Sequence, residues 1–236
     1  MVERSTLGFV AGATGLTGRS AVRALLDAGA GAVAHVRPDS PRLDAWRDTF
    51  EGWGAVLDAT PWDAAAMQAT LARLKPTVVF ALLGTTKQRA RAGDGDYQAV
   101  DFGLTRLLIE AAVASGAHPR IVYLSAVGVS AKARGAYYAA RWQAEQVLRE
   151  SGLPFVIARP SFIVGERDTP RPTERLGAGL IDAALGLAGA LGARRIAARY
   201  RSTTGEELAR ALVRLGLAPP ADRFVAEGFD LTDRNG

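Results

Sequence analysis

Three glycines at a spacing of three residues, Gly12, Gly15 and Gly18, are the clearest chemical feature of this chain. They lie in the segment GATGLTGRS, between a short apolar run and a stretch whose apolar residues recur at helical spacing. Without side chains, such a turn can be tight, a pyrophosphate can approach the backbone, and the helix can pack closely on a sheet. The pattern predicts a dinucleotide-binding turn, the alternative being a glycine-rich turn with a structural role only. The residues expected to contact the cofactor here are Gly12, Thr14, Gly15, Leu16, Thr17, Gly18 and Arg19.

The nucleotide preference is predicted from the end of the next strand pattern, which reads HVRPDS. A carboxylate there would bind the ribose 2′-hydroxyl of NAD, whereas an arginine suits the 2′-phosphate of NADP. This chain has His35 and Arg37 at that place, and Arg19 follows the third glycine as a second cation. We therefore expect NADP (NADPH), with NAD less favoured. The alternatives are NAD binding, which nearby Asp39 leaves open, and arginines that are only solvated surface residues.

The turn needs a strand before it and a helix after it, and the following sequence repeats that order. Short apolar runs alternate with stretches of helical periodicity, which predicts an α/β fold with a Rossmann-type, doubly wound parallel sheet. Ligands of such sheets lie beyond the carboxyl ends of the strands. Thr204 or Thr203 is expected to cap the last helix. Strands are expected over 5–12, 31–37, 54–60, 76–84, 120–127 and 154–160, and helices over 17–30, 41–50, 63–74, 97–116, 136–152 and 204–217.

The chain is long enough, at 236 residues with 48% hydrophobic residues, to bury a full core as one domain or one domain with a small lobe. We expect residues 1–160 to form the nucleotide-binding core and residues 161–236 a C-terminal substrate and lid region packed on the same domain. The most apolar window, 176–193, is short for a membrane helix and contains Asp182 and five glycines. We expect it to cover the pocket, with the charged segment 166–175 as a mobile entry.

Composition argues against several other classes. The chain has no cysteine, which excludes disulfides, thiolate metal sites and cysteine nucleophiles. The net charge of +5 suggests nucleic acid, but the arginines are scattered over separate expected elements, so we expect no nucleic-acid partner. His35 and His118 are far apart and lack a carboxylate ligand pattern, so no metal site is expected. The first residues enter a strand pattern at once, which predicts a cytoplasmic protein without a secretory signal or membrane span.

Five motifs, taken in order, resemble one known family. They are GATGLTG near the start, VLDAT on the third expected strand, LLGTT after the fourth, YLSAVG after the fifth and ARPSFIVG after the sixth. Over roughly residues 5–165 the chain resembles the atypical short-chain dehydrogenase/reductases, most closely their NAD(P)H-binding, NmrA-like branch. The resemblance implies a Rossmann-type fold, an NAD(P) cofactor and a small-molecule substrate.

The resemblance also implies cofactor contacts at the ends of the later strands. Each of these positions follows an expected strand, at the edge where ligands of the fold lie. The implied contacts are Asp58 and Ala59 with the adenine, Leu83, Gly84 and Thr85 with the adenosine and pyrophosphate, and Pro160 and Ser161 with the nicotinamide carboxamide.

Catalysis in the family it resembles uses a tyrosine as acid and base, a lysine four residues later, and a serine that orients the substrate carbonyl. The segment GAYYAARWQAEQ contains two tyrosines, but Arg141 follows Tyr137 and Trp142 follows Tyr138 at that spacing. Residues four apart share one helix face, so only Tyr137 has a cation beside it. The alternative for this pair is a helix-surface contact without chemistry.

The serine position also departs from the family pattern. In relatives the orienting hydroxyl lies one or two residues past the first serine of the strand end, where this chain has Ala126 and Val127. Ser125 is the available substitute, facing the substrate or the nicotinamide, and the alternative is a hydroxyl that caps the strand end. The expected catalytic residues are therefore Tyr137, Arg141 and Ser125.

Three functions follow from these residues. The first is an NADP-dependent oxidoreductase that transfers hydride to a small carbonyl or related apolar substrate, with Tyr137 as proton donor. The second is a non-catalytic NADPH-binding regulator with a protein partner, which the missing lysine and irregular serine favour. The third is an isomerase or epimerase of the same fold. Because Tyr137 keeps a cation on its helix face, the oxidoreductase is the function we expect.

Overall fold

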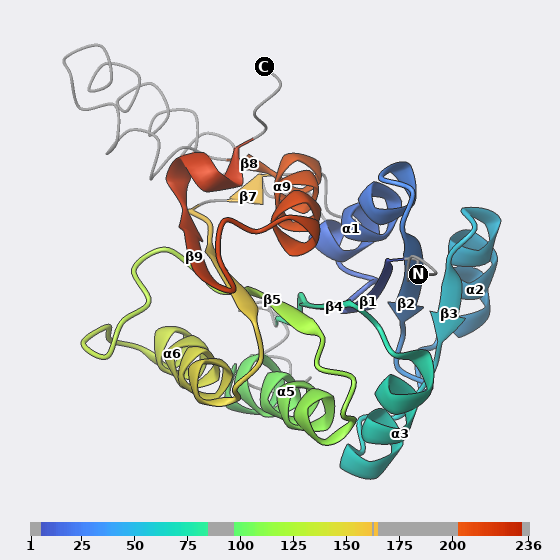
Figure 1. Cartoon of the computed structure of the whole chain (residues 1–236), viewed down its shortest axis with the longest axis horizontal. Coiled ribbons are helices and arrows are strands. Elements are labelled where there is room, and N and C mark those ends of the chain that lie inside the picture. The colour runs from blue at the N-terminus through green and yellow to red at the C-terminus, as the bar shows by residue number, and fades with distance from the viewer. Residues whose placement is uncertain (1–5, 85–96, 162, 165–202, 233–236) are drawn as a thin grey trace.

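A seven-stranded parallel sheet forms the centre of the molecule, in the order β3-β2-β1-β4-β5-β6-β9 (Figure 1). The computed structural model describes residues 6–84, 97–161, 163–164 and 203–232. Every neighbouring pair of strands in this sheet is parallel, which confirms the predicted doubly wound α/β fold. Its strands are β1 (Leu7–Ala11), β2 (Gly31–His35), β3 (Val56–Asp58), β4 (Val78–Ala81), β5 (Arg120–Leu124), β6 (Phe155–Arg159) and β9 (Arg223–Glu227), and a separate pair consists of β7 (Ile163–Val164) and β8 (Thr203–Thr204).

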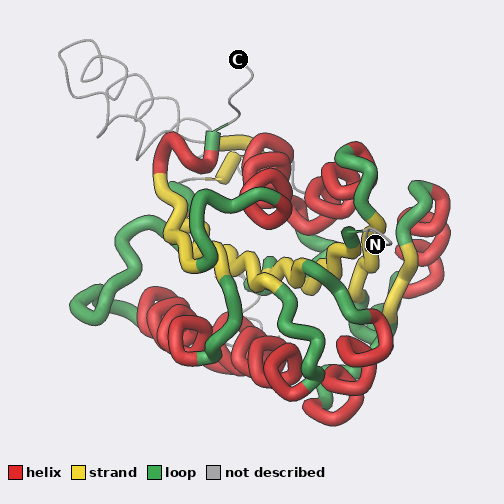
Figure 2. The backbone as a smooth tube through the Cα atoms, viewed as in Figure 1, coloured by secondary structure: helices red, strands yellow, loops and turns green. Residues whose placement is uncertain are grey.

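Helices cover both faces of the sheet (Figure 2). Successive strand residues point to opposite faces, so Val10 and Phe80 join one apolar cluster while Phe9 and Val79 join the other. The first cluster includes residues of α1, α2 and α9, and the second includes residues of α3, α5 and α6. The helices are α1 (Leu16–Asp27), α2 (Leu43–Gly52), α3 (Ala64–Leu74), the π-helix η1 (Tyr97–Leu104), α5 (Thr105–Ala114), α6 (Ala136–Glu150), α9 (Gly205–Leu217) and the 3₁₀-helix η2 (Gly228–Leu231).

The structure contains elements that were not expected, among them the short pair β7 and β8 and the 3₁₀-helix η2, and it divides one expected helix. The helix predicted over 97–116 is divided into η1 and α5, and the wider π-helical turn places Asp101 in the interior with no exposed surface. Such turns are rare and are frequently found at functional sites. The strand β9 was not predicted, because charged residues at both ends of RFVAE leave a very short apolar run.

The described part of the C-terminal region packs on the same sheet. Thr204 caps α9 as predicted: its hydroxyl accepts a hydrogen bond from the Glu207 N–H at 3.1 Å, and the Glu207 carboxylate accepts one from the Thr204 N–H at 2.9 Å. The segments 166–175 and 176–193, which we expected to form the pocket entry and cover, lie outside the described residues. Of the helices that the structure does describe, none has the length and apolar character needed to cross a bilayer.

Candidate active site

The glycine loop between β1 and α1 excludes side chains at two positions. Gly12 has a φ of 85°, and a Cβ built there would lie 2.6 Å from the carbonyl oxygen of Leu82. A Cβ on Gly18 would lie 2.1 Å from the carbonyl oxygen of Gly12. Both positions therefore require glycine, and Gly12 requires it also for its backbone conformation.

The helix α1 begins without a side-chain cap. Gly15 is the N-cap residue, and its N–H donates to the Gly12 carbonyl at 3.0 Å. The N–H groups of Leu16 and Thr17, in the first turn, receive no side-chain cap. Together with the positive end of the helix dipole, they form a site suited to an anion. Thr14 is exposed immediately before this turn, so the predicted pyrophosphate loop has an open approach.

Several arginines lie near the end of β2 and the start of α1. Arg37 is exposed and lies 3.5 Å from the Asp39 carboxylate. Arg19 and Arg42 contact the same indole, with their Cζ atoms 5.7 and 4.8 Å from the centroid of the Trp46 ring. Such contacts restrain a guanidinium without removing its charge. The sequence did not point to Arg42, because only the buried Trp46 ring links it to Arg19.

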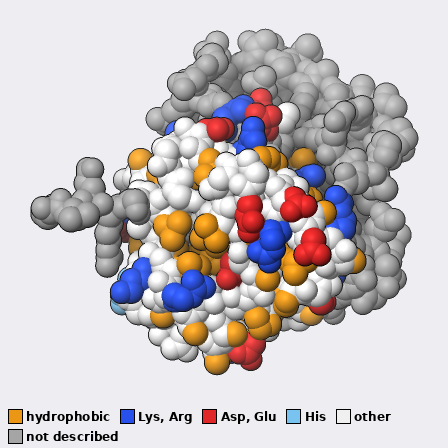
Figure 3. All heavy atoms as spheres, turned by 90° about the vertical axis from the view of Figure 1, so that its right-hand side faces the viewer, with side chains coloured by type: hydrophobic (Ala, Val, Ile, Leu, Met, Phe, Trp, Pro, Cys, Tyr) orange, Lys and Arg blue, Asp and Glu red, His pale blue; other side chains and the backbone are white. Residues whose placement is uncertain are grey.

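Basic side chains do not form one continuous surface on the face that includes α2. In Figure 3 the Lys and Arg side chains of that face lie in separate groups, and Asp and Glu side chains lie between them. The pairs Arg37 with Asp39 and Arg47 with Glu51 have this mixed character. Of these two arginines, Arg37 is the one at the end of β2, where the sequence predicts a phosphate ligand, and the Asp39 carboxylate offsets part of its charge.

At the ends of β2 and β3, His35 and Asp58 are held by Thr60. The Asp58 carboxylate accepts hydrogen bonds from the Thr60 N–H and hydroxyl at 3.1 and 2.9 Å. The His35 ring donates through Nε2 to the Thr60 carbonyl at 2.8 Å and packs edge-on against Trp62. Burial lowers the pKa of His35, although the Thr60 carbonyl and the Asp58 carboxylate oppose this effect. His35 is thus a neutral packing residue, and Asp58 and Ala59 are held in place beside the predicted adenine position.

Tyr137 and Arg141 lie on one face of α6, as their spacing predicts. The Arg141 Cζ lies 4.8 Å from the centroid of the Tyr137 ring. Arg141 is buried, where its Nη2 donates to Asp101 Oδ1 at 2.8 Å and its Nη1 donates to the Leu124 carbonyl. Tyr138 instead packs its ring edge-on against Tyr137, with centroids 5.3 Å apart. Of the two tyrosines, Tyr137 is the one over which the buried cation lies.

Burial is the main influence on the acidity of Tyr137. It raises the pKa of the phenol, the Arg141 guanidinium lowers it by its charge and by hydrogen bonding, and the Asp101 carboxylate raises it. The net result is a pKa above the ordinary value for tyrosine. At neutral pH the phenol is therefore protonated and is a proton donor rather than an acceptor.

Ser125 follows β5, and its hydroxyl contacts a buried carboxylate. It donates to Glu145 Oε1 at 2.7 Å. Arg159 donates to the two carboxylate oxygens of Glu145 at 2.9 and 2.6 Å, and to Glu227 of β9 at 3.2 Å. The Ser125 proton is therefore committed to Glu145, which leaves the hydroxyl oxygen as an acceptor. Sequence reasoning missed Glu145, although it follows Arg141 by one helical turn on the same face.

The end of β4 connects the glycine loop to α6. The Leu82 N–H donates to the Ala11 carbonyl at 3.0 Å, which places Leu83 and Gly84 beside the chain that leaves β1. A Cβ on Gly84 would lie 3.1 Å from Nη2 of Arg141. Gly84 thus lies between the predicted pyrophosphate loop and the buried cation.

The ends of β5 and β6 are joined in a similar way. The Val127 N–H donates to the Pro160 carbonyl at 2.8 Å, so Pro160 and the half-buried Ser161 lie beside the segment that follows Ser125. The structure therefore brings the predicted nicotinamide-side residues together at one edge of the sheet. Thr85, also predicted to bind the cofactor, lies outside the described residues.

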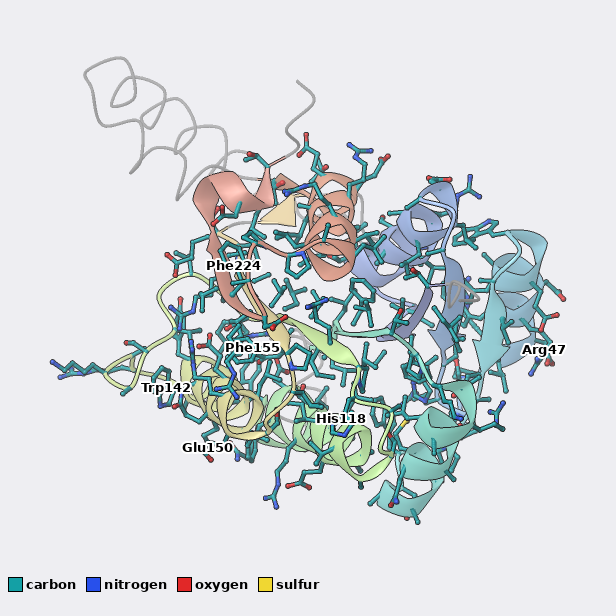
Figure 4. The ribbon with its side chains drawn as sticks, viewed as in Figure 1. Arg47, His118, Trp142, Glu150, Phe155 and Phe224 are labelled. Atoms are coloured by element: carbon teal, nitrogen blue, oxygen red, sulfur yellow. The ribbon has the colours of Figure 1, made fainter. Side chains whose placement is uncertain are left out.

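His118 lies at the other edge of the sheet. Figure 4 shows it beside α5, in the connection that leads to the first residue of β5, Arg120. Because all strands of the large sheet are parallel, this is the amino-terminal edge, opposite the edge at which ligands of such sheets bind. His118 therefore takes no part in the candidate site.

This arrangement defines a nucleotide-binding α/β protein, and comparison with known families agrees. A family model described as NAD(P)H-binding matches residues 12–181 of the chain. The chain belongs to this NAD(P)H-binding family, which confirms the family expected from the motifs. No functionally curated protein matches the sequence.

Solved structures share the fold at low sequence identity. A Bacillus halodurans protein described as an NAD-dependent epimerase/dehydratase has a TM-score of 0.67 and 17% identity, over 94% of this chain and 92% of its own. An oxidoreductase of the short-chain dehydrogenase/reductase family from Burkholderia thailandensis has a TM-score of 0.64 and 22% identity, over 94% and 90%. The Bordetella bronchiseptica enzyme WbmH, in complex with NAD+, has a TM-score of 0.63 and 17% identity, over 95% and 75%. At these identities the likeness shows the fold alone.

Replacing Gly18 by alanine should weaken dinucleotide binding. The added Cβ would lie 2.1 Å from the Gly12 carbonyl oxygen, so the loop and its N–H groups must move. We expect calorimetric titration with NADPH to show a loss of at least about tenfold in affinity, or about 1.4 kcal/mol. Gly52→Ala is the control, because a Cβ at Gly52 meets nothing within 4 Å. Equal binding by Gly18→Ala and the parent protein would contradict this role of the loop.

Replacing Glu145 by alanine should destabilise the fold. The change leaves the largely buried Arg159 guanidinium without its carboxylate partner on α6. Breaking a buried ion pair in this way costs about 3–5 kcal/mol, which urea unfolding would measure. Glu150→Ala, at an exposed position on the same helix (Figure 4), should change the free energy of unfolding by less than about 0.5 kcal/mol. If both variants lose the same amount, the Glu145 network does not stabilise the protein.

Proposed function

We propose that this protein is a cytoplasmic, NADP-dependent oxidoreductase of the atypical short-chain dehydrogenase/reductase type, acting on a small carbonyl or related apolar substrate. The observation that supports this most is the Tyr137 phenol beside the buried Arg141, on the helix where the family resemblance predicts the catalytic pair. Bound nicotinamide would supply the hydride. Tyr137 holds the proton that the substrate oxygen then needs, and the Arg141 guanidinium beside it would stabilise the tyrosinate left after transfer.

The residues present fit a dinucleotide. The uncapped first turn of α1 and the glycines around it suit the pyrophosphate. The buried Nε of Arg141 has no hydrogen-bond partner in the part of the chain that the structure describes, whereas buried donors normally have one. A ribose hydroxyl of the cofactor would satisfy it. Leu83, Gly84 and Thr85 would then line the adenosine and pyrophosphate side.

The nicotinamide end would be held at the ends of β5 and β6. Because the Ser125 proton is donated to Glu145, the serine oxygen suits a partner that donates a hydrogen bond. The amide group of the nicotinamide is such a donor, whereas a substrate carbonyl is not. We therefore assign Ser125, with Pro160 and Ser161, to the nicotinamide carboxamide, and Tyr137 to the substrate oxygen.

A second function, epimerisation or isomerisation with the same cofactor, is supported by the fold neighbour described as an epimerase/dehydratase. It would require Tyr137 both to accept and to return a proton. A third, an NADPH-binding regulator, is supported by the arginine at the lysine position and by the commitment of the Ser125 proton to Glu145. Turnover of a carbonyl substrate would distinguish the oxidoreductase from the regulator. Release of the reduced product, rather than its retention, would distinguish the oxidoreductase from the epimerase or isomerase.

The nucleotide preference is expected to depend on arginines at the end of β2 and the start of α1. NADPH should bind more tightly than NADH, because each charge-assisted contact with the 2′-phosphate is worth about 1.5–3 kcal/mol. Arg19→Ala with Arg37→Ala should remove the preference, and Arg42→Ala should reduce it, since Arg42 shares the Trp46 indole with Arg19.

Calorimetric titration of NADPH and NADH against each variant measures this preference. Arg47→Ala is the matched control, because Arg47 lies within α2 (Figure 4), where no contact with the 2′-phosphate is predicted. A preference that survives loss of Arg19, Arg37 and Arg42 would show that these cations do not bind the 2′-phosphate.

Removing the Tyr137 hydroxyl should impair turnover. We expect Tyr137→Phe to lower the rate with any accepted carbonyl substrate by about 100-fold or more, the effect of a positioned acid, with NADPH affinity nearly unchanged. NADPH oxidation followed by absorbance over a carbonyl panel measures the rate. Tyr138→Phe is the control, because its ring packs on Tyr137 rather than on Arg141. Full activity in Tyr137→Phe would exclude the proposed acid, and the absence of turnover in the parent protein would favour the regulator.

A further inference from the structure

Asp101 forms a buried ion pair directly behind the proposed proton donor. It comes from η1, has no exposed surface, and lies 2.8 Å from Nη2 of Arg141, whose side chain is 7% exposed. The other Arg141 amino group, Nη1, donates to the Leu124 carbonyl. Gly84 lies against this pair, since a Cβ there would be 3.1 Å from Nη2 and 3.6 Å from Asp101 Oδ1. The guanidinium is therefore held from three sides in one orientation over the Tyr137 ring.

The charge on Arg141 is opposed by a charge of opposite sign at hydrogen-bond distance. A paired cation and anion present a dipole to a third group, and the field of a dipole falls off faster than that of a single charge. The stabilisation that Arg141 offers to a negative Tyr137 oxygen is thereby partly offset by Asp101, whose effect on the pKa of Tyr137 is smaller than that of Arg141. The titratable and charged groups that face Tyr137 or interact with it in the described part of the chain are Arg141 and Tyr138 from α6, Asp101 and Tyr97 from η1, and Tyr123 from β5.

We propose that Asp101 is a positioning residue for Tyr137: it orients Arg141 over the tyrosine ring and offsets part of the guanidinium charge, so that it sets how far Arg141 stabilises the tyrosinate left when the proton is given up. This inference rests on the proposed function, in which Tyr137 gives its proton to the substrate oxygen. An arginine fits the role better than a lysine would, since its planar fork bonds the carboxylate and the Leu124 carbonyl at once.

The proposal predicts opposite effects for the two halves of the pair. Asp101→Asn keeps the shape but leaves the Arg141 charge unopposed, so it should favour the tyrosinate and lower the midpoint of the Tyr137 titration by about one pH unit. Arg141→Gln removes the cation beside the phenol and should raise the midpoint. The double variant removes one charge of each sign and should return the midpoint close to that of the parent protein.

The measurement is a tyrosinate absorbance titration of the full chain without cofactor or substrate. Each variant is compared with the same variant carrying Tyr137→Phe, so that the difference reports Tyr137 alone. Glu110→Gln, which breaks the exposed Arg106 pair at 2.7 Å, is the control and should not move the midpoint. Circular dichroism checks that each variant is folded. If one single variant is unfolded, the titration midpoints of the other single variant and of the double variant test the proposal.

Opposite shifts in the single variants with near-restoration in the double variant support the proposal. No shift in Asp101→Asn, or shifts in the same direction in both single variants, would overturn it. A pair with only a structural role would not move the Tyr137 midpoint in a direction set by the sign of the charge removed. The titration involves no turnover. Full activity of Tyr137→Phe would therefore contradict the proposed function alone, whereas an unmoved midpoint would contradict the role of Asp101 alone.

Discussion

The candidate site depends on the parallel register of the central strands. Ala81 of β4 pairs with Ala11 of β1 on one side and with Tyr123 of β5 on the other, and Leu124 pairs with Ala158 of β6. Strands in such a register end at nearly the same level, so the segments that follow them leave from one edge of the sheet. The glycine loop, Gly84, Ser125 and Pro160 therefore lie at that edge, although they are far apart in the sequence.

Two buried ion pairs fix α6 against this edge. Tyr137, Arg141 and Glu145 occupy successive turns on one face of the helix, and each charge meets a partner from another element: Asp101 of η1 and Arg159 of β6. A buried charge without its partner is costly, so α6 cannot rotate or slide without losing both pairs. The position of the Tyr137 hydroxyl thus depends on charge pairing as well as on apolar packing.

The sequence predicted the features whose causes are local. The glycine loop, the shared face of Tyr137 and Arg141, and the Thr204 cap each depend on residues within one or two turns of one another, and the central strands are continuous apolar runs. Features created by distant contacts could not be predicted. Asp101 lies 40 positions from Arg141, and Arg159 lies 68 from Glu227. The strand β9 was missed for the same reason, because its charged ends are satisfied by partners that only the folded sheet provides.

The charge balance around Tyr137 bears on the direction of the chemistry. A reduction needs a group that gives a proton to the substrate oxygen, whereas epimerisation by oxidation and return needs one group to take a proton first and give it back later. A tyrosine beside an unopposed cation would do both near neutral pH, because its two protonation states would be close in free energy. Here burial and the Asp101 carboxylate both raise the pKa of Tyr137, against the effect of Arg141. The protonated state is therefore the resting state of this site, as the proposed reduction requires of its proton donor.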